Sequence, residues 1–136
     1  MPFEFYEHTA DVGIRAWGDS LPEAFGQAAL GLIANMVETP SADALEDVHL
    51  SVQAANAERL LFRFLEEVLF HFQTELVVFT AADVRLDLSA GKLDAQLRGE
   101  RYDAARHGHV HEIKAITMHD LALSYEPPEV RLIVDI

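Results

Sequence analysis

The chain begins with apolar and polar residues in alternation. Residues 3–6 and 12–17 both follow this period of two, and Asp11 lies at the break between them. Such alternation puts one face of an extended strand against a core and leaves the other face in solvent. We therefore predict two half-buried strands at the start of the chain, with Asp11 where they meet.

Two longer segments repeat apolar residues every three or four positions, which is typical of amphipathic helices. The first opens with the capping box 20–23 and reaches Met36, and the second follows a capping Asn56 and reaches Phe72. Side-chain oxygens at such caps accept from the first free amides of a helix. The second helix is rich in aromatic residues, most of which we expect in the core, with a minority left for a partner surface.

Further alternation predicts strands at 48–54, 84–88, 93–97, 113–119, 121–125 and 130–136, with a glycine turn at 89–92 and a histidine-rich polar connection at 102–111. The expected product is a single α+β domain over residues 1–136. In it, two amphipathic helices pack on a mostly antiparallel or mixed sheet.

Composition narrows the function classes. The 136 residues are 50% hydrophobic, include no cysteine and carry a formal charge of −13. The missing cysteines exclude disulfides and thiolate metal sites and favour a cytoplasmic protein. The negative charge disfavours direct binding of nucleic acid, and no apolar run is long enough to span a membrane.

Carboxylates near the two ends form the first candidate site. Asp11 follows the first strand, Asp135 ends the last one, and the main-chain carboxylate of Ile136 comes next. If the fold brings them together, they offer the hard oxygen ligands that Ca²⁺, Mg²⁺ or Mn²⁺ prefers. The alternative is that Asp11 is an ordinary turn residue and Asp135 a solvated acid.

Histidines and one lysine form two further candidates. His107, His109 and His111 alternate in sequence, with His119 nearby, and could hold zinc if the connection is extended. A solvated loop is the competing interpretation. Lys114 interrupts an apolar run and is either an electrostatic contact or an edge-strand lysine that discourages aggregation.

Several blocks taken together resemble the archease family. They are His8-Thr9-Ala10-Asp11-Val12-Gly13-Ile14-Arg15-Ala16-Trp17-Gly18, Gly99-Glu100, Glu112-Ile113-Lys114-Ala115-Ile116-Thr117-Met118-His119 and Val134-Asp135-Ile136. The resemblance spans the whole chain and depends on the order and spacing of the blocks. The sequence departs from the family at Met118, where a tyrosine is common, and in its histidine-rich connection.

The resemblance implies a protein cofactor and not an enzyme. Archeases activate the RtcB-type RNA ligase of tRNA splicing and RNA repair by promoting guanylylation of its catalytic histidine with GTP, and they sustain multiple turnover. Carried over by motif, the metal-binding acids are Asp11, Asp135 and the carboxylate of Ile136, with Ca²⁺ expected first. Lys114 matches a lysine needed for activation. Three further motif residues, expected to serve activation or partner contact, are His8, Glu100 and His119.

Two other functions compete with activation. One is a stand-alone metal-dependent hydrolase built on His107, His109, His111 and His119. The other is an interaction module whose aromatic helix binds a partner and whose acidic residues only keep the protein in solution. Neither the metal, nor the RNAs that the partner joins, nor the oligomeric state follows from the sequence.

Overall fold

The structure is a computed structural model that describes residues 2–8, 11–38, 43 and 46–136, with the backbone alone at residues 7 and 8. The elements in chain order are β1 (Phe3–His8), β2 (Asp11–Trp17), α1 (Leu21–Met36), β3 (Glu46–Gln53), α2 (Ala57–Glu75), β4 (Val77–Asp87), β5 (Lys92–Arg101), α3 (Ala104–His107), β6 (Ala115–Ile116), β7 (Ala122–Tyr125) and β8 (Pro128–Asp135).

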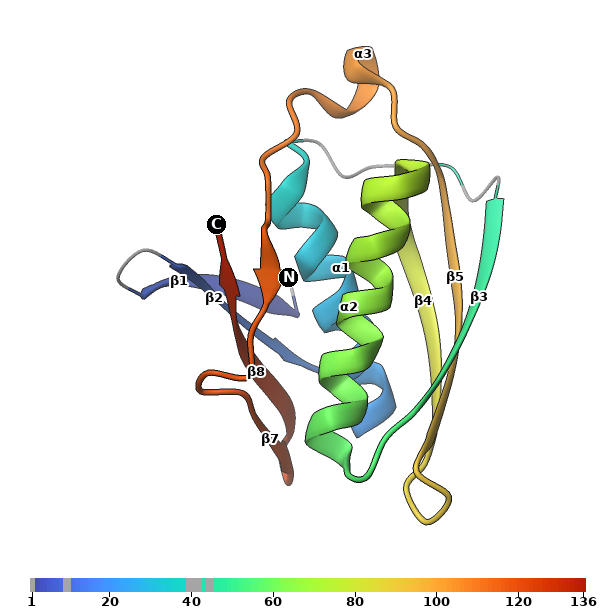
Figure 1. Cartoon of the computed structure of the whole chain (residues 1–136), viewed down its shortest axis with the longest axis vertical. Helices are drawn as coiled ribbons and strands as arrows, with labels where there is room; N and C mark the ends of the chain where they lie inside the picture. The colour runs from blue at the N-terminus through green and yellow to red at the C-terminus, as the bar shows by residue number, and fades with distance from the viewer. Residues whose placement is uncertain (1, 9–10, 39–42, 44–45) are drawn as a thin grey trace.

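The described strands form two antiparallel sheets. One has the order β1-β2-β8-β6, with β7 also paired to β8, and the other has the order β3-β5-β4. Helices α1 and α2 lie between them (Figure 1), where α1 packs on β2 and β4, and α2 packs on β3 and β6. The α+β class is confirmed, but the strands divide into two sheets because alternation reveals a half-buried strand without revealing its partners.

Local sequence signals set the helix ends. The Ser20 hydroxyl accepts from the amide of Glu23 at 3.2 Å, and the Asn56 side chain accepts from the amide of Arg59 at 2.9 Å. Helix α2 ends at Glu75, and the C-cap that follows it, Leu76, has a φ of 53° in the left-handed region. Both predicted caps are therefore confirmed, as is the turn between β4 and β5, where Gly91 has a φ of 63°.

The core lies where the two helices meet the two sheets. Its largest fully buried side chains include Phe25, Phe64, Phe79, Ile14, Leu32 and Leu97. On the inner face of the five-stranded sheet, Ile14 and Ala16 of β2 lie opposite Leu132 and Val130 of β8. The outer face of the same two strands is left for polar residues, because successive side chains of a strand point to opposite faces.

The segment between β5 and β7 differs from the sequence prediction. Its histidine-rich part contains the short helix α3, and the strand predicted over residues 113–119 is reduced to Ala115–Ile116. Ile113 is buried in the core without belonging to that strand. No helix among the described residues is long and apolar enough to cross a membrane.

Candidate functional site

One row of residues crosses the five-stranded sheet at the end where Asp11 lies. In this row His8 of β1 pairs with Asp11 of β2, Asp11 pairs with Asp135 of β8, and Asp135 also pairs with Ala115 of β6. Directly opposed residues of antiparallel strands point to the same face, with Cβ atoms about 4.5–5.5 Å apart. The fold therefore sets Asp11 and Asp135 beside each other, although nearly the whole chain separates them.

Lys114 and Ile136 lie next to this pair. The amide of Lys114 donates to the main-chain oxygen of Asp135 at 2.7 Å. Ile136 follows Asp135 directly and is 46% exposed. Figure 1 shows the C-terminus beside β6, which Lys114 precedes. We call Asp11, Asp135 and the main-chain carboxylate of Ile136 the carboxylate cluster, with Lys114 as its neighbour.

The sheet surface next to the carboxylate cluster is closely packed and largely apolar. Gly13 pairs with Tyr6 on one side and with Ile133 on the other. The Tyr6 ring covers Gly13 so closely that a Cβ added there would lie 2.0 Å from a ring carbon. Burial raises the pKa of the Tyr6 phenol, Asp120 raises it further, and Arg131 opposes the shift. Only glycine at position 13 lets the aromatic ring close over the sheet at this point.

Strand cations on this face lie away from the carboxylate cluster. Arg15 and Arg131 oppose each other four residues along the strands from Asp11 and Asp135, a separation of roughly 13 Å along an extended chain. The Arg15 guanidinium already binds Glu4 at 2.8 Å and also binds Glu129. The Arg15 guanidinium is thus engaged by glutamates at the other end of this face.

This donor set fits a hard divalent cation. Like charges directly opposite each other in a sheet are destabilising, and a cation between carboxylate oxygens relieves that repulsion. Among the described residues, no three His, Asp or Glu side chains gather as a metal-ligand group. A site at the carboxylate cluster would therefore combine two aspartates with a main-chain carboxylate.

Glu100 lies elsewhere, in a buried cluster with α3. Its carboxylate is 6% exposed and accepts from His107 Nε2 at 3.0 Å and from Arg106 at 3.1 Å. The amide of Asp103 donates to His107 Nδ1 at 2.9 Å, so the ring proton is on Nε2 and donates to Glu100. These bonds tie β5 to the connection that leads to Lys114, so Glu100 lies apart from the carboxylate cluster, and its expected part in activation or partner contact stays a prediction.

The interpretation of these histidines as a metal site, which competed with a solvated loop, is wrong. The His107 ring is fully buried and stacks on Tyr102 with ring centroids 5.8 Å apart, whereas His109, His111 and His119 are exposed. Among the described residues, these histidines form no group of three with one another or with Asp or Glu side chains that could hold a metal ion. The expected alternation failed because the chain turns into α3 at this point, so side chains no longer alternate as they do in a strand.

His119 lies on the loop between β6 and β7. Its imidazole is 3.5 Å from the carboxylate of Asp120, and both side chains are exposed. The same Asp120 acts on the Tyr6 phenol, so this loop approaches the outer face beside the carboxylate cluster. His8 is placed by its backbone pairing with Asp11 alone.

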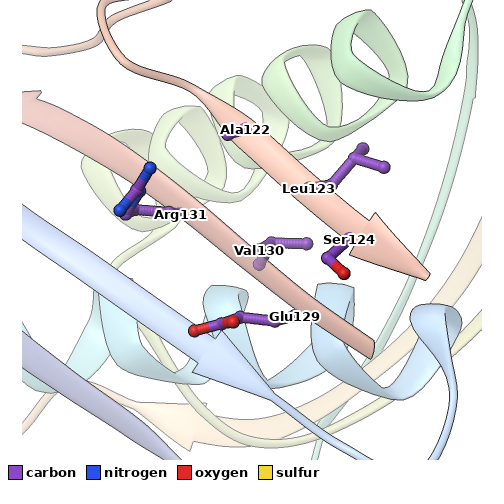
Figure 2. A pocket seen from close by; sticks show the side chains of 6 residues that line it. All are labelled: Ala122, Leu123, Ser124, Glu129, Val130 and Arg131. Atoms are coloured by element: carbon purple, nitrogen blue, oxygen red, sulfur yellow. The ribbon is translucent and has the colours of Figure 1, made fainter. Parts of the chain in front are cut away.

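A separate hollow of about 260 Å³ lies between β7 and β8 (Figure 2). Its charged side chains are Glu129 and Arg131, which occupy the same face of β8. Glu129 is already bound to Arg15. The one acid that lines the hollow is therefore already in an ion pair. As a candidate functional site, the hollow is weaker than the carboxylate cluster.

Sequence reasoning missed one residue near the site. Gln73 of α2 donates from Nε2 to the main-chain oxygen of Ile113 at 3.2 Å, immediately before Lys114. A glutamine on the polar side of an amphipathic helix carries no signal of such a contact. The contact shows that α2 helps to fix the backbone that brings Lys114 to Asp135.

Comparison with known proteins places this fold and these motifs in one family. The chain matches the archease protein family (MTH1598/TM1083) over residues 3–136. It is 38% identical to a protein archease of Pyrococcus furiosus over 127 residues, which cover 92% of this chain and 89% of the relative. It is 34% identical to that of Sulfolobus acidocaldarius over 136 residues, with 98% of each chain covered.

Solved structures agree with the fold. The solution structure of protein 1598 from Methanobacterium thermoautotrophicum matches with a TM-score of 0.84 and 29% identity, covering 99% of both chains. The crystal structure of an archease from Thermotoga maritima, described as a possible chaperone, matches the fold with a TM-score of 0.63 at 17% identity, covering 96% of this chain and 94% of that one. With the family match over nearly its whole length, the chain belongs to the archease family.

Proposed function

We propose that this protein activates an RtcB-type RNA ligase in tRNA splicing and RNA repair. It would promote GTP-dependent guanylylation of the ligase's catalytic histidine and sustain multiple turnover, while the ligase carries out the chemistry. Membership of the archease family supports the proposal. The observation that carries it is the direct pairing of Asp11 with Asp135, with Lys114 hydrogen-bonded to the same residue.

The carboxylate cluster is proposed to hold a divalent cation, with Ca²⁺ first and Mg²⁺ or Mn²⁺ as alternatives. Asp11 and Asp135 supply side-chain oxygens, and Ile136 supplies a main-chain carboxylate. Such a cation would offset negative charge on the cluster and on nearby phosphate oxygens. Lys114, whose main-chain amide bonds to Asp135, carries an exposed positive charge that suits an electrostatic contact with a nucleotide held by the partner.

The overall charge of −13 fits a protein that approaches a basic ligase cleft without competing for RNA. Complementary charge speeds and orients association between proteins. Activation then amounts to favouring the ligase conformation that accepts GMP, because a partner shifts an equilibrium by binding one state more tightly than the other. We expect no direct contact with nucleic acid.

The proposal is tested by following the covalent ligase–GMP adduct. A slow cognate ligase is incubated with labelled GTP, divalent metal and this protein, and adduct formation is quantified over time. We expect stimulation by the unaltered chain and its loss in Asp135→Ala, because an exposed acid away from packing typically costs under about 0.5 kcal/mol of stability on substitution. Addition of residues after Ile136 should also abolish stimulation.

Asp83→Ala is the matched control. Asp83 is an exposed acid on β4 of the three-stranded sheet, so its removal changes the net charge equally without touching the carboxylate cluster. It should stimulate like the unaltered chain. Absence of stimulation by the unaltered chain at any ratio to the ligase would reject activation, and full activity of an extended chain would remove Ile136 from the site.

A further inference from the structure

A groove runs between α2 and β6 beside the carboxylate cluster. It encloses about 340 Å³, and its lining includes Phe70, Glu66, Glu67, Gln73, Lys114 and Ala115. Strand β6 packs against α2 and pairs with β8, the strand that leads to Ile136. We call it the α2–β6 groove.

Phe70 is an exception among the aromatic residues of α2. Its side chain is 57% exposed, while Phe64 and Phe72 of the same helix are buried. The apolar stripe of α2 is complete without Phe70, whose exposed ring contacts the neighbouring His71 ring edge-on, with the centroids 6.3 Å apart. An exposed aromatic face attracts an arginine or lysine head group, especially in a recess that excludes water.

Acidic residues stand beside that ring. Glu66 and Glu67 precede Phe70 by four and three positions, which places them next to it on the helix surface. Within the described residues, neither carboxylate lies within salt-bridge distance of a cation, although Lys114 lines the same groove and Arg59 and Arg63 line the adjoining recess. An aromatic ring flanked by two unpaired carboxylates is a receptor for a guanidinium group, because it offers both stacking and charge-assisted hydrogen bonds.

The wall of the groove formed by residues 114–116 is fixed in place. The Gln73 side chain donates to Ile113 at 3.2 Å, and Ile113 itself is buried. Ala115 then pairs with Asp135. A partner that reaches the carboxylate cluster therefore meets the groove as a continuous and preformed flank, which lowers the entropic cost of docking.

We propose that the α2–β6 groove binds a basic segment of the partner ligase through an arginine. The guanidinium lies against the Phe70 ring and pairs with Glu66 or Glu67, while the aliphatic stem of the arginine covers the apolar part of the groove. This inference rests on the proposed activation of a ligase. In it the groove supplies affinity, and the carboxylate cluster supplies activation.

The test separates affinity from maximal stimulation. Ligase–GMP formation is measured against increasing concentrations of this protein, and binding to the ligase is measured directly by fluorescence anisotropy of the labelled chain. Phe70→Ala and Glu66→Lys should each raise the half-maximal concentration and the dissociation constant about tenfold, as central aromatic and charged contacts do. Maximal stimulation at saturation should stay unchanged, and the binding defect of Glu66→Lys should shrink as salt is raised.

Leu88→Ala and Asp83→Lys are the matched controls. Leu88 is an exposed apolar residue at 43%, and Asp83 is an exposed acid of the other sheet. Both should bind and stimulate like the unaltered chain. If the unaltered chain stimulates but both groove variants keep its half-maximal concentration, the groove proposal is rejected and activation stands. If the unaltered chain neither binds nor stimulates the ligase, the proposed function itself fails.

Discussion

The opposed aspartates give a sharp stability prediction. Asp11 and Asp135 face each other across β2 and β8, so the metal-free protein carries two like charges at one cross-strand position. Asp135→Asn keeps the size of the side chain and its polar character while removing one of these charges. In the presence of a chelator, this variant should be more stable than the unaltered protein.

The magnitude follows from the pairing geometry. Cβ atoms of directly opposed residues are about 5 Å apart, and two carboxylates that turn away from each other are separated by about 6 Å. At that distance, two unit charges repel by about 0.7 kcal/mol in a water-like dielectric, and less in salt. For a domain of this size, the gain corresponds to a rise of about 2–3 °C in melting temperature.

Calcium should reverse the order of stability. A ligand that binds only the folded state at a hundred times its dissociation constant adds about 2.7 kcal/mol, and the asparagine variant lacks one charged ligand. Thermal unfolding is therefore followed by circular dichroism for both proteins in chelator and then in a calcium series. Asp83→Asn serves as the control and should respond to calcium like the unaltered protein.

Two results would refute this reasoning. If Asp135→Asn melts below the unaltered protein in chelator at low salt, the opposed charges do not repel to a measurable extent. If calcium raises the melting temperature of both proteins equally, Asp135 does not hold the cation. A calcium effect that disappears in Asp135→Asn while the control keeps it would support the carboxylate cluster as a metal site.

Three further predictions concern the surroundings of the site. Gly99→Ala should destabilise the protein by more than about 2 kcal/mol in denaturant unfolding, because its Cβ would lie 1.9 Å from the main-chain oxygen of Val78. Gln73→Leu should cost about 1 kcal/mol and speed hydrogen exchange at the Lys114 amide, while amides in the middle of α2 stay protected. Tyr6 has a raised pKa, so the stability that its neutral phenol contributes is present below the ordinary tyrosine pKa and is lost as pH rises through the higher folded value. Ultraviolet titration of Tyr6→Phe should lack that late ionisation, and a late phase that persists in the variant would contradict the assignment.

Local signals were sufficient for the helices and turns. The side chains of Ser20 and Asn56 each accept a hydrogen bond from an amide three residues later, and Gly91 takes the positive φ of its own turn. The local sequence was therefore enough to predict both caps and the turn. The amphipathic stripes likewise identified which face of α1 and α2 is buried. These predictions succeeded because the interactions that decide them join neighbours in the chain.

Long-range contacts were beyond the same reasoning. Alternation indicated strands at both ends of the chain, but only the fold shows that Asp11 is in register with Asp135. Ile113 looked like a strand residue, whereas its burial comes from contact with the core beside α2. His107 looked like a potential ligand because its role depends on Glu100 and Tyr102, which meet it only after α3 has formed.

The position of β8 in the sheet has a consequence for synthesis of the protein. Strand β8 is made long after β1 and β2, yet it pairs with β2 on one side and with β6 and β7 on the other. A nascent chain on the ribosome therefore holds β1 and β2 with an unfilled sheet edge until the residues of β8 leave the exit tunnel. Asp11 and Lys114 acquire their neighbour Asp135 only at that moment, so the site cannot assemble before β8 has been made and has paired with β2.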